Sequence, residues 1–146
     1  MTRLARFRRP IRLSPARDAR GTAVVELAIT LPILLTLIMG ILAYGDYFLV
    51  AHSVQQAAND AARAAIAGLD AAERASIAAS TVETTLRRQG LLDPALAATS
   101  VDDDGSTLVV RLAYDDSADP LLHLSFVPTP DPRIRRSAAI RLGGLT

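Results

Sequence analysis

The chain has 146 residues and a net charge of +1, which conceals a strong asymmetry. Residues 1–20 carry seven Arg and one Asp, whereas the remaining residues carry nine Arg and fourteen acidic side chains. The absence of cysteine excludes disulfides, thiolate metal sites and a cysteine nucleophile. With six aromatic residues and no Trp, any soluble core has to be built from Leu, Val, Ile and Ala.

Residues 1–20 form a basic segment with two prolines and no sustained helical pattern. We expect a disordered or surface-lying leader. Short basic flanks of a membrane helix stay on the cytoplasmic side, so the charge predicts a cytoplasmic N-terminus and an acidic remainder outside the cytoplasm. A basic tail can also bind nucleic acid. Topology and anionic lipid already account for this one, and no nucleic-acid partner is expected.

The segment Leu27–Gly45 reads LAITLPILLTLIMGILAYG and carries no charge. At about 1.5 Å per residue, a helix of this length spans roughly the 30 Å hydrocarbon core of a bilayer. Gly40 lies near its far end. A cleaved secretory signal is the alternative, but the apolar stretch is too long and residues 43–47 make a poor cleavage site. The sequence therefore predicts a transmembrane helix.

Pro32 lies inside this predicted helix. Proline has no backbone N–H and clashes with the carbonyl four residues back, which belongs to Ala28. Thr36 follows the break and is not an obvious partner for that carbonyl. Two interpretations stay open: a kink without consequence, or a helix that bends when it packs among copies of itself.

No proline or glycine interrupts residues 46–67, so the membrane helix is expected to continue beyond the bilayer. An apolar stripe with helical spacing follows this extension. It comprises Val50, Val54, Ala57, Ala58, Ala61, Ala65 and Ile66. The stripe either covers the chain's own domain or contacts a neighbouring subunit, and the spacing does not decide between the two.

A second helix is predicted after a break at residues 68–70. Asp70 caps its start, and Glu73 three residues later completes a capping box. Basic residues near Arg88 complement the C-terminal dipole, and Gly90 ends the helix. Ile77, Val82, Leu86 and several alanines are expected on its buried side.

The last third of the chain predicts strands. Residues 96–101 and 107–114 flank an Asp-Gly sequence, which is a strong hairpin signal because the turn needs a positive φ. Residues 121–127 form a third strand or an apolar loop, and residues 134–142 read as a final strand. The expected fold is α+β: a transmembrane helix extended into a long helix, a second helix, and an antiparallel sheet of three to four strands. We expect a leader (1–21), a membrane and extended helix (22–67), and a small domain (68–146).

No catalytic set stands out in the sequence. His52 and His123 lie far apart in the chain and are interpreted as ordinary surface or half-buried residues. None of the common nucleophile, zinc or phosphate-loop motifs is present. Asp102–Asp104 lack the spaced ligands of a calcium loop and read as a solvated turn. We expect no enzyme, no metal and no cofactor.

Glu26 is a lone carboxylate at the edge of the apolar segment, five positions after Gly21. In isolation it would simply favour the dipole of the helix N-terminus. If the chain is cut after Gly21, Thr22 becomes a new N-terminus, and its amine lies about one helical turn from Glu26. Pairing within a chain or between neighbouring helices would then fix the stagger between subunits, a register role for a buried polar group.

The N-terminal segment resembles the start of TadE-like proteins, the minor pseudopilins of the tight-adherence (Flp pilus) system. The resemblance rests on Arg20–Ala28 (RGTAVVELA) and on Leu31–Leu35 (LPILL). It extends to the alanine-rich helix at residues 55–65 and, less specifically, to Ser137–Leu142. One departure is Leu27, since the residue after the glutamate is often aromatic in this group.

The resemblance implies a protein of pilus assembly and not an enzyme. A membrane prepilin peptidase would remove the leader after Gly21. The mature chain would stay in the bacterial inner membrane with its domain in the periplasm, beside other pilins, pseudopilins and the assembly platform, or reach the pilus at the cell surface. The alternative is an unprocessed single-span protein whose outer domain binds a partner or the cell wall.

Overall fold

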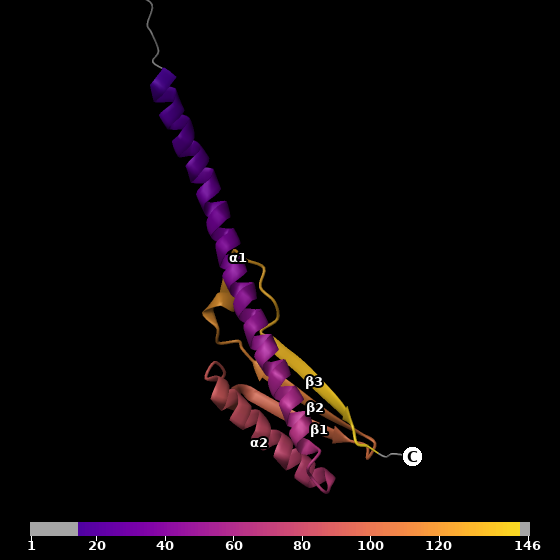
Figure 1. Ribbon diagram of the computed structural model, residues 1–146. Helices are drawn as coiled ribbons and strands as arrows, with labels where there is room; N and C mark the ends of the chain where they lie inside the picture. The colour runs from indigo at the N-terminus through magenta and orange to yellow at the C-terminus, as the bar shows by residue number, and fades with distance from the viewer. Residues whose placement is uncertain (1–14, 144–146) are drawn as a thin grey trace, which may run out of the picture. The chain divides into compact units, whose positions relative to one another are not determined.

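The computed structural model describes residues 15–143, with side chains from Gly21 onward. The described residues form two α-helices, a three-stranded antiparallel sheet and two short 3-10 helices. Figure 1 labels the α-helices and the strands. The elements are α1 (Pro15–Ala65), α2 (Ala71–Gln89), η1 (Pro94–Leu96), β1 (Ala97–Asp103), β2 (Thr107–Asp115), η2 (Pro120–His123) and β3 (Arg133–Arg141). The predicted α+β fold is confirmed, with three strands.

The chain divides into two compact units, residues 1–37 and residues 38–146. In its described part the first unit consists of helix α1 alone. Most of the predicted leader, residues 1–14, lies outside the described residues. Residues 15–20 are helical, which corrects the expectation that the leader lacks helix. The reason is that proline is well suited to the first helical position, where it needs no hydrogen-bond partner for its nitrogen.

The second unit has one hydrophobic core, to which α1, α2 and one face of the sheet all contribute. The side chains of the predicted stripe on α1 are buried in this core, from Val50 to Ala65, and Ala57, Ala58 and Ala61 are completely inaccessible. Ile66 is the exception and is exposed, because α1 ends at Ala65 and the helical spacing ends with it. The open question is thus answered: the stripe covers the chain's own domain.

Helix α2 has the caps that the sequence predicted. The Asp70 carboxylate accepts a hydrogen bond from the Glu73 backbone N–H at 2.8 Å, and the Glu73 carboxylate accepts one from the Leu69 N–H at 2.7 Å. At the other end Gly90 adopts a φ of +67° and donates to the Leu86 carbonyl at 3.3 Å. Only a residue without a Cβ takes this conformation at little cost.

The buried side of α2 differs slightly from the prediction. Val82 and Leu86 are buried as expected, together with Ala78 and Thr85, but Ile77 is only partly covered. Ile77 lies toward the start of the helix, at the margin of the face that meets β1. Fewer side chains of α2 are therefore buried near its start than the helical periodicity alone indicates.

Arg74 connects the turn before α2 to the sheet. Its Nη1 donates to the Asp103 carboxylate at 2.7 Å, and its Nε donates to the Gly68 carbonyl at 3.1 Å. A Cβ added at Gly68 would lie 2.7 Å from the Arg74 backbone nitrogen, so the turn admits only glycine without rearrangement. The break between the helices is tightly packed.

The sheet has the order β1-β2-β3, with both pairs antiparallel. In β2 alternate residues face the core: Leu108, Val110, Leu112 and Tyr114 are buried. The turn between β1 and β2 uses Gly105 at a φ of +83°, as the Asp-Gly signal predicted. Residues 121–127, left open as strand or loop, form the end of η2 and an irregular loop.

Candidate functional site: the exposed apolar part of helix α1

The apolar part of α1 is exposed along its described length in the first unit. Every side chain from Gly21 to Leu37 is accessible, including Leu27, Ile29 and Ile33 at 60–65%. By length and composition, the helix Gly21–Ala65 is long and apolar enough to cross a membrane. So many adjacent apolar side chains are not covered by protein that lipid is the environment that suits them. The helix indicates a single-pass membrane protein.

The predicted processing and register residues share this helix. Gly21, Thr22 and Glu26 are all exposed on α1, and nothing lies within 4 Å of a Cβ built on Gly21. Thr22 and Glu26 are four residues apart in a continuous helix, which puts them on the same side one turn apart. Within residues 21–143 no ion pair to Glu26 is formed. The roles of these residues stay predictions.

Pro32 lies inside α1, and the helix continues through it. Thr36 donates its hydroxyl to the Pro32 carbonyl at 2.9 Å, a bond within the following turn. It does not reach the Ala28 carbonyl that proline leaves without its usual donor, in line with the sequence argument. Gly40 and Gly45 follow on the same helix but belong to the second unit.

The two histidines are exposed and belong to different elements. His52 lies on α1, and the His123 ring nitrogen Nε2 is 2.6 Å from the Ser117 carbonyl oxygen. A shallow cavity of about 420 Å³ lies on the sheet and is lined by Ala98, Thr99, Ser100, Arg111, Leu112, Ala113, Arg135, Arg136 and Ser137. Arginine is the only ionisable residue type in this lining. That the chain is not an enzyme stays a prediction.

The run Asp102–Asp104 makes local contacts. Asp103 accepts from the Gly105 N–H and pairs with Arg74, and Asp104 accepts from the backbone of Ser106 and Thr107. The Arg74 hydrogen bond, followed by the Gly105 N–H, lowers the pKa of Asp103. Backbone N–H donors likewise lower the pKa of Asp104. These carboxylates stabilise the turn and the α2–β1 contact.

Sequence reasoning missed a second carboxylate cluster. One carboxylate oxygen each of Asp46, Asp116 and Asp119 lies within 4.8 Å of the others. Asp46 comes from α1 directly after the apolar segment, and the other two precede η2. A hydrogen bond to Asp119, burial, and the negative charges of Asp119 and Asp116 raise the pKa of Asp46 to about 6. Burial raises the pKa of Asp116, whose Oδ2 is inaccessible and without a partner.

The only sequence signal for this cluster was the position of Asp46 as the first charge after the apolar segment. Asp116 and Asp119 lie in a short stretch rich in aspartate, a residue that is common in turns, so their presence there does not point to a cluster. Nothing in the sequence links them to a residue about seventy positions earlier. The cluster arises only when the segment between β2 and β3 folds back against α1.

Comparison with known proteins gives one family. The family model described as TadE-like protein matches residues 21–63. The match begins at Gly21, includes Glu26 and the apolar segment, and ends in the buried stripe of α1. Searches among curated proteins and among solved structures found no match. The resemblance read from the N-terminal motif is confirmed over this range, and residues 21–63 of the chain are TadE-like.

Proposed function

We propose that this protein is a minor pseudopilin that takes part in assembly of a tight-adherence (Flp-type) pilus. The observation that carries the proposal is the TadE-like match over residues 21–63, which begins at Gly21 and contains the exposed apolar stretch of α1. The TadE-like family indicates a tight-adherence pilus system. The specific role as pseudopilin, and not as enzyme, is our inference from the motif around Glu26.

The proposed topology follows from charge. The basic residues 1–20 stay in the cytoplasm, Leu27–Gly45 spans the inner membrane, and the α+β domain lies in the periplasm. A membrane prepilin peptidase then cuts after Gly21 at the cytoplasmic face. The partners after cleavage are other pilins, pseudopilins and the assembly platform.

The buried stripe of α1 supports different roles for the two parts of the helix: one packs in the domain, and the other contacts neighbouring subunits. From Val50 to Ala65 the apolar face is covered by the chain's own core, so contacts between subunits through this face are excluded. The side chains of residues 21–38 are all exposed and have no such cover. Packing against neighbouring pilin helices therefore uses the membrane part of α1, where Glu26 and the new amine of Thr22 set the register.

The first test measures processing. The intact mass of the full chain, expressed with and without a cognate prepilin peptidase, is expected to fall by the mass of residues 1–21. A Gly21→Leu variant is expected to keep its leader. Space around Gly21 is open, so this change leaves the fold intact, and Gly45→Leu, another open glycine of α1, serves as the matched control. Retention of Met1 in the unaltered chain with active peptidase would refute the proposal in favour of an unprocessed single-span protein.

The second test separates processing from assembly. Glu26→Ala and Glu26→Gln are expected to be cleaved normally but to reduce the pili recovered by shearing cells. Glu83→Gln is the matched control, because Glu83 makes only an exposed i,i+4 pair with Arg87. Normal pilus yield from both Glu26 variants would exclude a register role for this carboxylate.

A further inference from the structure

The segment between β2 and β3 contains an uncharged apolar stretch. Residues 120–130 read PLLHLSFVPTP, with no acidic or basic residue other than His123, and Asp119 and Asp131 bound it on either side. Figure 1 shows this segment, in orange, running alongside α1 beyond the end of the sheet. We call residues 120–130 the apolar loop.

The apolar loop is attached to α1 at two points. The Val127 side chain lies against Gly40, where an added Cβ would be 3.7 Å from its Cγ1, and Val127 is buried. Leu121 lines a small cavity together with Gly45 and Leu49 of α1. The loop is therefore seated beside residues 40–49, across the position where the apolar segment ends at Gly45.

The contact between Val127 and Gly40 sets how deep the apolar loop would lie in the bilayer. Gly40 is five residues before Gly45, so at about 1.5 Å per residue Val127 lies roughly 7 Å inside the outer end of the predicted span. Apolar faces of interfacial elements insert to a depth of about 5–10 Å, at the boundary between headgroups and acyl chains. The loop lies at this depth if α1 spans the bilayer as proposed.

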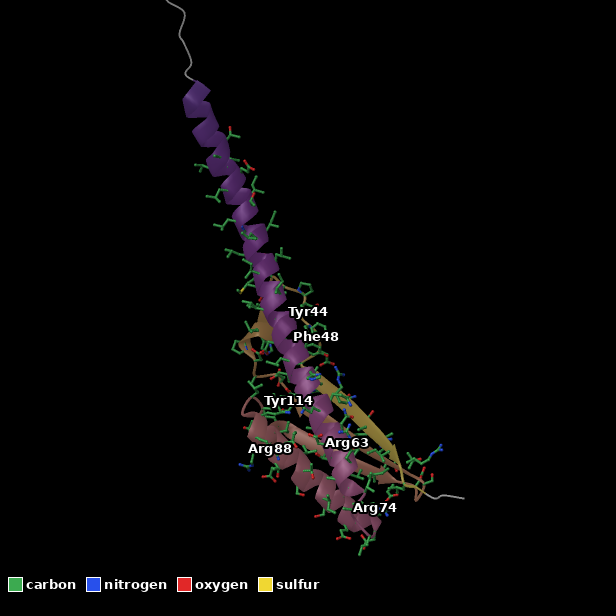
Figure 2. The ribbon with its side chains drawn as sticks, in the orientation of Figure 1. Tyr44, Phe48, Arg63, Arg74, Arg88 and Tyr114 are labelled. Carbon is green, nitrogen blue, oxygen red and sulfur yellow. The ribbon has the colours of Figure 1, made fainter. Side chains whose placement is uncertain are left out.

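The outward side chains of the loop suit that environment. Phe126 is 58% exposed although its neighbour Val127 is buried, so the ring points away from the protein. On α1 the rings of Tyr44 and Phe48 are exposed as well, within the residues 40–49 beside which the loop lies; Figure 2 labels both. Aromatic rings prefer the membrane–water interface, and prolines fix an irregular backbone without requiring many hydrogen bonds.

We propose that the apolar loop is a second membrane-contacting element, which inserts Phe126 into the outer boundary of the same bilayer that α1 spans. The partner is a lipid surface and not a protein, because the loop lies beside the outer end of the predicted span, where Ile41, Leu42 and Tyr44 are exposed, and carries no acidic or basic residue other than His123. The proposal rests on the membrane insertion in the proposed function. It adds that the domain lies against the bilayer and does not stand away from it.

The test uses the natural absence of cysteine. Ser125 is exposed beside Phe126, so a Ser125→Cys variant of the full chain carries a spin label without removing the ring. The protein is reconstituted at low density in phosphatidylcholine–phosphatidylglycerol vesicles. Relaxation of the label by oxygen and by a water-soluble nickel chelate then reports its depth. Labels at Ile33→Cys and Ser100→Cys give the bilayer interior and the aqueous reference.

The label at position 125 is expected to collide with the nickel chelate several-fold less than the label at position 100, and to lie between the two references. A Phe126→Asp change in the same chain is expected to return it to aqueous accessibility. Leu69→Asp, at the exposed turn after α1, is the matched control and is expected to leave the accessibility of position 125 unchanged.

Equal chelate access at positions 125 and 100, with position 33 protected, would overturn the loop proposal alone. Chelate access at position 33 as well would refute membrane insertion itself. If protection of position 125 disappears when the protein is diluted in lipid, the label is covered by a second copy of the chain and not by lipid. That result would also overturn the loop proposal.

Discussion

The carboxylate cluster at Asp46 predicts an unusual dependence of stability on pH. The pKa of Asp46 rises from 3.8 to about 6 in the folded chain, first through the hydrogen bond to Asp119. A folded-state pKa above the unfolded value means that the folded chain binds the proton more tightly. The resulting stability is fully present below about pH 4 and is lost as the pH rises through about 6.

The magnitude follows from the shift. Each pKa unit corresponds to about 1.4 kcal/mol, so the shift sets an upper bound of about 3 kcal/mol. Asp46 is only partly buried, and solvent screening reduces this value. We expect the free energy of unfolding to fall by about 1 kcal/mol between pH 4.5 and 7.5. The turn carboxylates Asp103 and Asp104 have lowered pKa values, so their contribution is lost only below about pH 4, outside this window.

The decisive variant is Asp46→Asn. Its amide donates to Asp119 at every pH and removes the like charge, so at pH 7.5 the variant should be more stable than the unaltered chain by about 1 kcal/mol. For a unit of this size that is roughly 4 °C in the unfolding midpoint. The assay is thermal and urea unfolding of the full chain in detergent micelles, followed by circular dichroism at several pH values. Asp102→Asn, in an exposed pair with Arg111, is the control.

Two results would refute this reasoning. One is stability in the unaltered chain that stays constant or increases between pH 4.5 and 7.5. The other is an Asp46→Asn variant that keeps the full pH dependence. Asp102→Asn removes an exposed carboxylate outside the Asp46 cluster, so it controls for the loss of one aspartate elsewhere in the domain.

Three further changes test the packing of the domain by the same unfolding assay. Leu86→Ala removes a completely buried side chain and should cost about 2–5 kcal/mol; a cost near zero would contradict its place in the core. Gly68→Ala forces a Cβ against the Arg74 backbone and should cost about 1–3 kcal/mol, so a stabilised variant would show that the turn is looser than described. Asp70→Ala removes the acceptor for the Glu73 N–H and should cost about 1 kcal/mol, whereas an unchanged midpoint would argue against a working cap.

Features set by neighbouring residues were predictable from the sequence. The capping box at Asp70 and Glu73, the stop at Gly90 and the turn at Gly105 each depend on a few adjacent residues, and all were found. The apolar segment was equally clear because its length matches a bilayer. These signals determine the elements and most of their limits.

Features set by distant residues were not predictable. Helical spacing showed that one face of α1 from Val50 to Ala65 is buried, but it did not show whether the cover is the chain's own sheet or another subunit. The proximity of Asp46 to Asp119 depends on the fold of everything between them. The contact of Val127 with Gly40 is likewise a tertiary contact. The sequence of an apolar loop does not show which element the loop packs against.

The two parts of α1 should accumulate substitutions in different ways. The buried alanines between Ala57 and Ala65 fill a closed space, so adding even one methyl group there would crowd the core. From Leu27 to Leu37 the side chains face outward, and in a bilayer any apolar residue of similar size is acceptable. In one continuous helix, the size of the side chains is thus constrained at one end, and only their apolar character is constrained at the other. Sequence drift along it is expected to exchange Leu, Ile and Val freely in the first part while the alanines of the second part stay small.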